Sequence, residues 1–176
     1  MRTLLVASTL LLLPLVGLGT PASGQQPITV SSASASATSV DPRAARAGRA
    51  SAEKRVVRLT NKRRANHGCK PLKVRKPLRR AARRHSARMA EAGVMSHQLP
   101  GEPPLGKRVT AAGYTNWTMV GENIAFGYTS PRALVRAWMR SPSHRAQILT
   151  CRYRHIGVGR AHGNGTVWWT QVFGRK

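Results

Sequence analysis

Acidic residues are scarce in this sequence. Its 176 residues include five Asp and Glu against 30 Lys and Arg, which gives a formal net charge of +25. A chain of this charge is attracted to polyanions, such as nucleic acids, anionic lipid headgroups and acidic polymers of the cell envelope. Most of the basic residues are arginine, which the codon usage of a GC-rich genome would also favour. The charge alone therefore does not identify a nucleic-acid-binding protein.

Aromatic residues are also few, and none lies between residues 51 and 88, where half of the Lys and Arg residues are found. Stacking platforms for single-stranded bases are therefore missing from the most basic stretch. The sequence has neither helix-turn-helix spacing nor a zinc-finger array. We do not expect nucleic acid as a partner. The basic stretch is either a solvated charged face or a surface for an anionic cell-envelope polymer or lipid.

Only one long apolar run is present, from Leu4 to Leu18. It follows the single basic residue Arg2, precedes the small residues Ala22-Ser23-Gly24, and is short for a membrane span. We interpret residues 1–24 as a signal peptide and expect a secreted protein, with a membrane anchor as the alternative. Residues 25–50 are rich in Ser and Ala and predict a disordered linker. Residues 51–176, a length that suits one domain, remain for the folded part.

Cysteine occurs only at Cys69 and Cys151. In an oxidising compartment the natural pairing is one disulfide between them. Closing a loop of about eighty residues would stabilise the fold by roughly 4 kcal/mol on the chain-entropy model. The alternative is two unrelated buried thiols.

Hydrophobic periodicity changes along the chain, from helical in the first part to alternating near the end. It predicts helices over residues 51–67, 77–92, 131–140 and 143–149, a helical turn over 107–112, and strands over 153–161 and 167–173. Large side chains on both faces of the last strand indicate a sheet covered on both sides. Gly157 and Gly159 suggest that another backbone approaches closely. The predicted fold class is α+β.

Glu122 stands out as an acid in the mostly apolar segment 121–127. A buried carboxylate is costly unless it is hydrogen-bonded, paired with a cation or bound to a metal. The segment therefore predicts either a functional carboxylate or a structural one whose oxygens accept backbone N–H bonds.

Ordered motifs over about residues 54–174 resemble the CAP superfamily, the SCP-like extracellular proteins related to cysteine-rich secretory proteins. The match is carried by Leu59-Thr60-Asn61, Arg64-Ala65, Pro71-Leu72, Ala81-Ala82, His85-Ser86, Met89-Ala90, Ser96-His97, Ala112-Gly113-Tyr114, Gly121-Glu122-Asn123-Ile124-Ala125, Trp138-Met139, Ser141-Pro142-Ser143-His144-Arg145, Ile148-Leu149, Ile156-Gly157-Val158-Gly159 and Thr170-Gln171-Val172-Phe173.

The resemblance implies an α-β-α sandwich, with a small central sheet flanked by helices, and a cleft lined by His and Glu. By motif, the cleft residues are His97, Glu122 and His144, which would hold a divalent metal such as zinc. The family's second Glu is absent, because residues 140–142 are Arg-Ser-Pro, and Gln147 replaces the usual Asn. A His–Glu–His hydrogen-bond cluster that stabilises the fold is the alternative, and His85 is interpreted as a core histidine.

These observations predict a binding protein for a divalent cation, a small lipid or a cell-envelope ligand, and we expect a monomer. The rival hypothesis is a metal-assisted hydrolase or peptidase that uses the same cleft. A third is a structural protein held at the envelope by its arginines. No serine lies in a nucleophile-elbow context, which excludes a serine-hydrolase interpretation. Whether any catalysis occurs stays open at this point.

Overall fold

The computed structural model describes residues 41–176. The predicted signal peptide and residues 25–40 of the predicted linker lie outside this part of the chain. None of the helices between residues 41 and 176 is long and apolar enough to cross a membrane.

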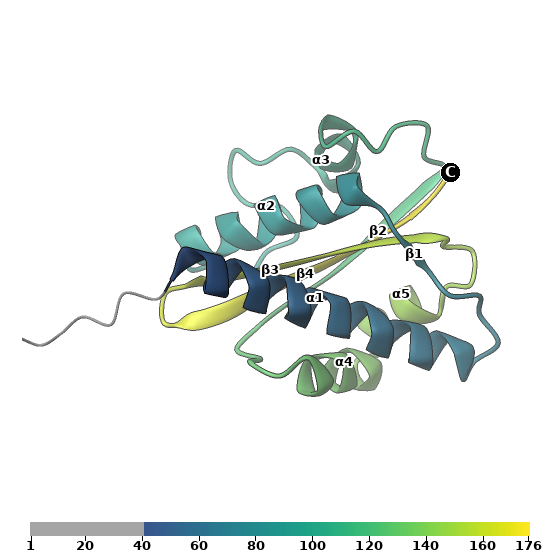
Figure 1. Ribbon diagram of the computed structural model, residues 1–176. Coiled ribbons are helices and arrows are strands. Elements are labelled where there is room, and N and C mark those ends of the chain that lie inside the picture. The colour runs from purple at the N-terminus through teal and green to yellow at the C-terminus, as the bar shows by residue number, and fades with distance from the viewer. Residues whose placement is uncertain (1–40) are drawn as a thin grey trace, which may run out of the picture. The chain divides into compact units, whose positions relative to one another are not determined.

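A four-stranded sheet forms the centre of the domain (Figure 1). Its strands are β1 (Lys73–Val74), β2 (Met119–Phe126), β3 (His155–Gly163) and β4 (Thr166–Arg175), in the spatial order β1-β3-β4-β2. The short β1 pairs parallel with β3, and the other neighbours are antiparallel. The predicted hairpin is confirmed as β3 and β4, with left-handed Asn164 and Gly165 at its turn.

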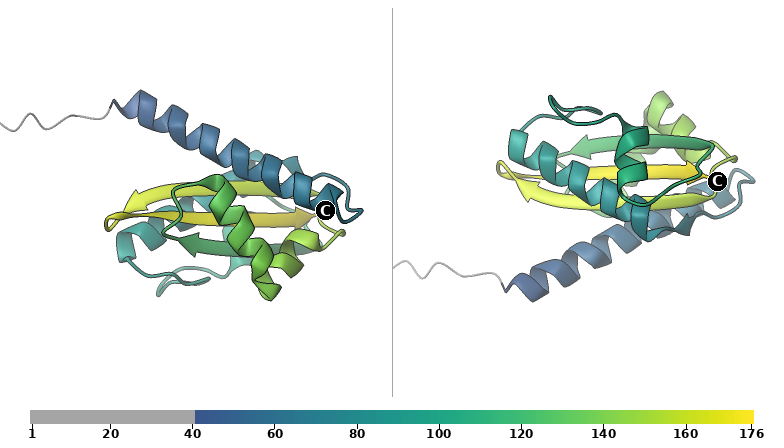
Figure 2. Two further views of the ribbon diagram at one scale, coloured as in Figure 1. Left: turned by 90° about the horizontal axis from the view of Figure 1, so that it is seen from below. Right: turned by 90° about the horizontal axis from the view of Figure 1, so that it is seen from above.

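Helices cover both faces of the sheet, as the turned views in Figure 2 show. On one face lie α1 (Pro42–Ala65), α4 (Pro131–Arg140) and α5 (Pro142–Leu149), and on the other lie α2 (Lys76–Ala92) and α3 (Leu105–Ala111). Residues of β4 contribute side chains to both faces of the sheet. Trp169 and Phe173 pack in the core beneath α1, α4 and α5, and Val172 packs in the core beneath α2 and α3. The predicted α+β class and α-β-α sandwich are confirmed.

The first helix starts earlier than the sequence pattern predicted. α1 begins at Pro42 rather than near Ser51, so residues 42–50 of the predicted linker are helical. The Asp41 side chain accepts a hydrogen bond from the Arg43 backbone N–H at 2.8 Å, and Pro42 occupies the first turn, where its missing N–H costs nothing. Low apolar content suggested disorder, but Ala and Arg are strong helix formers, and this local preference prevails.

Two glycines let α2 lie directly against the sheet. A Cβ atom at Gly157 would come within 2.2 Å of the α2 backbone at Leu78 and Arg79, and one at Gly159 within 2.3 Å of Ala82. The predicted close backbone approach is confirmed. It fixes α2 over β3 and β4, and therefore fixes the face of the sheet on which His85 of α2 lies.

The end of α1 is tied to the segment after α5 in two ways. Cys69 and Cys151 form the predicted disulfide. Arg64, which is completely buried, donates to the carbonyl oxygens of Lys70, Ile148, Thr150 and Tyr153 at 2.7–3.2 Å. Its guanidinium thus satisfies backbone acceptors that no helix or strand reaches.

Candidate functional site

Glu122 lies in the middle of β2, paired with Val172 of β4. Its side chain is only 3% exposed. The carboxylate is therefore buried, as the sequence predicted, and its oxygens accept from side chains rather than from the backbone.

Arg108 of α3 is the main partner of Glu122. Its Nη1 donates to Oε2 of Glu122 at 3.0 Å, and its Nη2 donates to Oε1 at 3.2 Å. The same Nη2 donates to the backbone carbonyl of His97 at 2.8 Å. One buried guanidinium therefore neutralises the carboxylate and fixes the loop that carries His97.

His97 lies in the segment between α2 and α3, and its Nδ1 is 3.0 Å from Oε1 of Glu122. The rest of the ring faces outward, since 60% of its side chain is exposed. Burial alone would raise the pKa of Glu122, but hydrogen bonds from His97 and Arg108 and the charge of Arg108 outweigh it, so this pKa lies below its ordinary value. The carboxylate is an acceptor that orients the imidazole.

His85 lies beneath this pair and is completely buried, as expected for a core histidine. Its Nδ1 lies 2.8 and 3.0 Å from the two carboxylate oxygens of Glu102. Its Nε2 faces Oε1 of Glu122 at 3.7 Å and has no hydrogen-bond partner in the described part of the chain. The Glu122–His97 pair thus rests against a second buried histidine–carboxylate pair.

The sequence analysis did not identify Glu102 or Arg108. One feature of the sequence could have drawn attention to Glu102: it is one of only five acidic residues and lies in a Pro- and Gly-rich loop. If such an acid is buried, it needs a partner. Nothing distinguishes Arg108 in the sequence from the many other arginines.

His144 lies in the first turns of α5 and is half-buried. Burial lowers its pKa, and the nearby charge of His97 lowers it further. The side chain of Asn123 donates to the backbone carbonyl of His144 at 3.1 Å. Glu122 and His97 are thus in direct contact, and His144 completes the set only through its electrostatic coupling to His97.

A groove of about 500 Å³ opens beside His144. Its lining includes Met95, Phe126, Tyr128 and Trp138. Phe126 and Met95 are 49% and 47% exposed, whereas Trp138 is buried and donates from its indole N–H to the Ile124 carbonyl at 3.2 Å. The groove therefore has an apolar wall and one imidazole, a composition typical of small-molecule sites.

The geometry tests the predicted metal ligands. Both oxygens of Glu122 are engaged by Arg108 and His97, and the positive guanidinium opposes a cation there. Among residues 41–176 no three His, Cys, Asp or Glu side chains are grouped so that they could hold a metal ion. The three-ligand set of His97, Glu122 and His144 therefore does not fit in this arrangement, and two imidazoles remain as candidate ligands.

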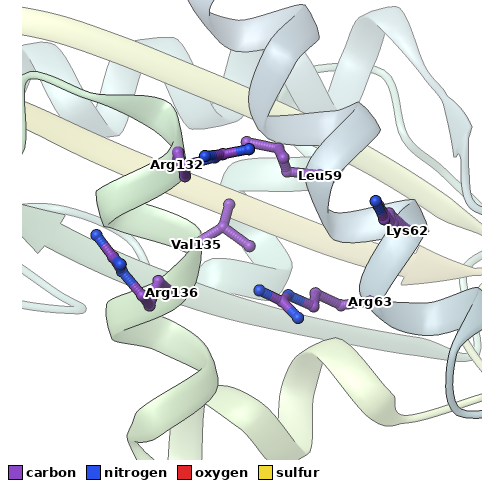
Figure 3. A pocket seen from close by; sticks show the side chains of 6 residues that line it. All are labelled: Leu59, Lys62, Arg63, Arg132, Val135 and Arg136. Carbon is purple, nitrogen blue, oxygen red and sulfur yellow. The ribbon is translucent and has the colours of Figure 1, made fainter.

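A second groove, of about 280 Å³, lies between α1 and α4 (Figure 3). Leu59 and Val135 supply its aliphatic surface, and four cations surround them: Lys62, Arg63, Arg132 and Arg136. None of these four side chains takes part in an ion pair within the described residues. This surface presents uncompensated positive charge.

Comparisons with known proteins agree with this architecture. The sequence model of the cysteine-rich secretory protein family, CAP, matches residues 57–173. Two Bacillus subtilis (strain 168) proteins, the uncharacterized protein YkwD and the uncharacterized membrane protein YlbC, are 38% and 36% identical over 70% and 61% of this chain. Those matches take in 47% and 31% of the relatives, so the chain spans less than half of their length.

Solved structures show the same fold. An extracellular SCP-domain protein from Bacillus anthracis str. Ames superposes with a TM-score of 0.71 at 26% identity, over 78% of this chain and 44% of that one. An outer surface protein from Borrelia burgdorferi gives a TM-score of 0.65 at 20% identity, over 72% of this chain and 93% of that one. With the family match covering most of the domain, the chain belongs to the cysteine-rich secretory protein (CAP) family.

Proposed function

We propose that this protein is an exported binding module that holds the apolar part of a lipid-like envelope ligand in the groove beside His144. The observation that carries the proposal is the pair of large apolar side chains, Met95 and Phe126, which stay about half exposed along one groove. Soluble domains rarely leave such side chains together at the surface without a binding role.

The polar end of the groove supports an amphipathic ligand. His144 lines it, and its lowered pKa keeps the imidazole neutral near pH 7, able to accept or donate one hydrogen bond. His97 stands beside it, with its outward side exposed and its Nδ1 held by Glu122. A hydroxyl or ester group of the ligand would find its partners here.

Export is part of the proposal. It is supported by the leader-like residues 1–24, by the Cys69–Cys151 disulfide and by structural neighbours described as extracellular or outer-surface proteins. The unpaired cations of the α1/α4 groove would hold the exported domain near an anionic envelope surface.

A divalent metal would be held by His97 and His144 through their ring nitrogens, with Glu122 orienting His97 from behind. When bound, such an ion would supply a Lewis-acidic centre at the polar end of the groove. Elemental analysis of wild type against His97→Ala and His144→Ala tests this part of the proposal. Zero metal in the wild type after zinc is supplied at neutral pH would rule it out.

The binding proposal is tested by titrating a fluorescent long-chain lipid into wild type, Phe126→Ser and Val74→Thr. Val74 is 47% exposed but belongs to β1, away from the groove, so it is a matched control. We expect Phe126→Ser to weaken binding at least tenfold and Val74→Thr to leave it unchanged. Equal loss in both variants, or none in either, would contradict the groove as the site.

Mass spectrometry of the recovered lipid separates binding from the rival hydrolase. The binding proposal expects intact lipid after long incubation. Hydrolysed lipid, with product formation lost in Glu122→Gln and after chelation, would favour the hydrolase. The geometry disfavours Glu122 as a general base, because its lowered pKa and its bonds to Arg108 make it a weak proton acceptor.

A further inference from the structure

The early start of α1 produces a feature that the proposed function does not use. Residues 42–48 are exposed, and this end of the helix diverges from the β3–β4 hairpin (Figure 2). The space between them, of about 970 Å³, is here named the α1–β3 wedge. Its lining consists of Pro42, Arg43, Ala45, Arg46, Gly48, Arg49, Arg160, Ala161 and His162.

The charges in the wedge have one sign. Four arginines and one histidine line it, and no acidic residue does. None of the four arginines forms an ion pair within the described residues. The nearest acids are occupied, since Glu53 accepts three hydrogen bonds from Arg83 and Asp41 caps α1.

Two of these guanidinium groups also have unused donors. The Nε atoms of Arg49 and Arg160 are shielded from solvent and donate to no acceptor in the described part of the chain. A buried donor without an acceptor is destabilising. Arg160 is held in place by stacking over Trp169, 5.4 Å from the ring centroid. Because these Nε atoms are covered, an anion in the wedge would pair with the other guanidinium nitrogens of the two arginines.

We propose that the α1–β3 wedge binds a linear polyanion with recurring phosphate groups, which the arginines of α1 and Arg160 hold from two sides. Guanidinium forks match phosphate oxygens in pairs, which lysine does not do, and every permanently charged side chain in the wedge is arginine. Arg43, Arg46 and Arg49 follow each other at three-residue intervals. Side chains at that spacing lie about 5–6 Å apart on one side of a helix, which suits charges that repeat along a polymer.

Other anionic partners fit the wedge less well. It contains no Phe, Tyr or Trp side chain on which a nucleobase could stack. It is concave and roofed by a helix, so a flat bilayer surface cannot enter it. The chain's own first forty residues contain no Asp or Glu and cannot neutralise it.

The test measures binding of end-labelled inorganic polyphosphate by fluorescence anisotropy, with Arg43→Gln/Arg46→Gln against Arg55→Gln/Arg58→Gln. Both pairs are exposed on α1, three residues apart, and remove the same charge, while only the first lines the wedge. We expect the wedge pair to lose at least tenfold in affinity and the control pair to lose less than threefold. Equal losses would show diffuse attraction to a basic protein and overturn the proposal.

Binding measurements with other anions test which kind of anion the wedge prefers. Single-stranded DNA or anionic phospholipid vesicles that bind more tightly than polyphosphate, and lose affinity equally in Arg43→Gln/Arg46→Gln, would overturn the choice of polymer. Orthophosphate that competes at equal phosphate concentration would reduce the site to a free-phosphate site. The lipid groove is not involved, so Phe126→Ser should bind polyphosphate as the wild type does.

His162 provides a local readout. Burial and the charge of Arg160 lower its pKa. Phosphate groups in the wedge should raise that pKa, which NMR detects in the wild type, and the rise should be absent in Arg43→Gln/Arg46→Gln. A His162 resonance unaffected by saturating polyphosphate would contradict the proposed location.

Discussion

Arg108 and Glu122 form a buried ion pair, in which two guanidinium nitrogens lie 3.0 and 3.2 Å from the two carboxylate oxygens. The pair joins α3 to β2, and through the His97 carbonyl it also holds the loop that carries His97. The position of His97 relative to Glu122 therefore depends on an arginine that lies outside the predicted site residues.

Removing the arginine should be costly. Arg108→Met leaves the Glu122 charge buried without its main partner, and we expect the free energy of unfolding to fall by about 3–5 kcal/mol. Adding Glu122→Gln removes the stranded charge and should restore part of that loss. Urea denaturation of the two single variants and the double variant measures the coupling. A double variant no more stable than Arg108→Met would show that the charge pairing is unimportant.

The same carboxylate predicts a specific acid sensitivity. Because the pKa of Glu122 in the folded protein lies below its ordinary 4.5, the unfolded chain binds this proton first as the pH falls. The stabilisation is therefore complete above about pH 4.5 and is lost as the pH drops through the folded-state pKa.

We expect Glu122→Gln to flatten the fall in unfolding free energy as the pH drops below about 4.5. Glu91→Gln is the matched control, since Glu91 is exposed and takes part in no ion pair within residues 41–176. The prediction would be contradicted if the unfolding free energies of wild type and Glu122→Gln fell equally steeply at acidic pH.

The coupling of the two cleft histidines can be measured directly. Burial is the main reason that the pKa of His144 is lowered, and the charge of His97 adds to it. The NMR titration midpoint of His144 should therefore lie below 6.5 in the wild type and rise partway in His97→Gln. His67→Gln, a change at an exposed histidine beyond the end of α1, should leave it where it was. A His144 midpoint that does not change in His97→Gln would contradict the electrostatic coupling of the two rings.

Close contact between α2 and β3 predicts opposite outcomes for two glycine substitutions. Gly157→Ala places a methyl group within 2.2 Å of the α2 backbone and should cost about 1–3 kcal/mol or more. Gly48→Ala lies on an exposed helix with nothing within 4 Å and should stabilise by about 0.5–1 kcal/mol. Thermal unfolding of both variants checks the pair. A neutral Gly157→Ala would show that α2 can move away without loss.

Hydrophobic periodicity predicted the helices and the hairpin but not the other two strands. The β3–β4 hairpin follows from alternation, and α2 and α4 follow from helical periodicity. Strand β2 was not predicted, because residues 121–125 are buried on both faces and show no alternation. The two-residue β1 exists only through its pairing with β3, a tertiary effect that local sequence does not contain.

For the site, family motifs identified the residues but not their arrangement. His97 and Glu122 lie within hydrogen-bond distance of each other, which agrees with their assignment to one site. The sequence did not indicate that Arg108 would also donate to the Glu122 carboxylate. This contact depends on how α3 packs against β2. The residues around Arg108 in the sequence do not indicate that packing.

The placement of β3 and β4 has a consequence for the order of events during synthesis. In the described domain these strands follow all the other elements in the chain, yet they lie at the centre of the sheet, and both α1 and α2 bury their apolar faces on that sheet. Neither helix has a surface to pack on until residues 155–175 have left the ribosome. The domain therefore cannot fold stepwise from its N-terminal helices, and we expect its folding to wait until both strands have been made.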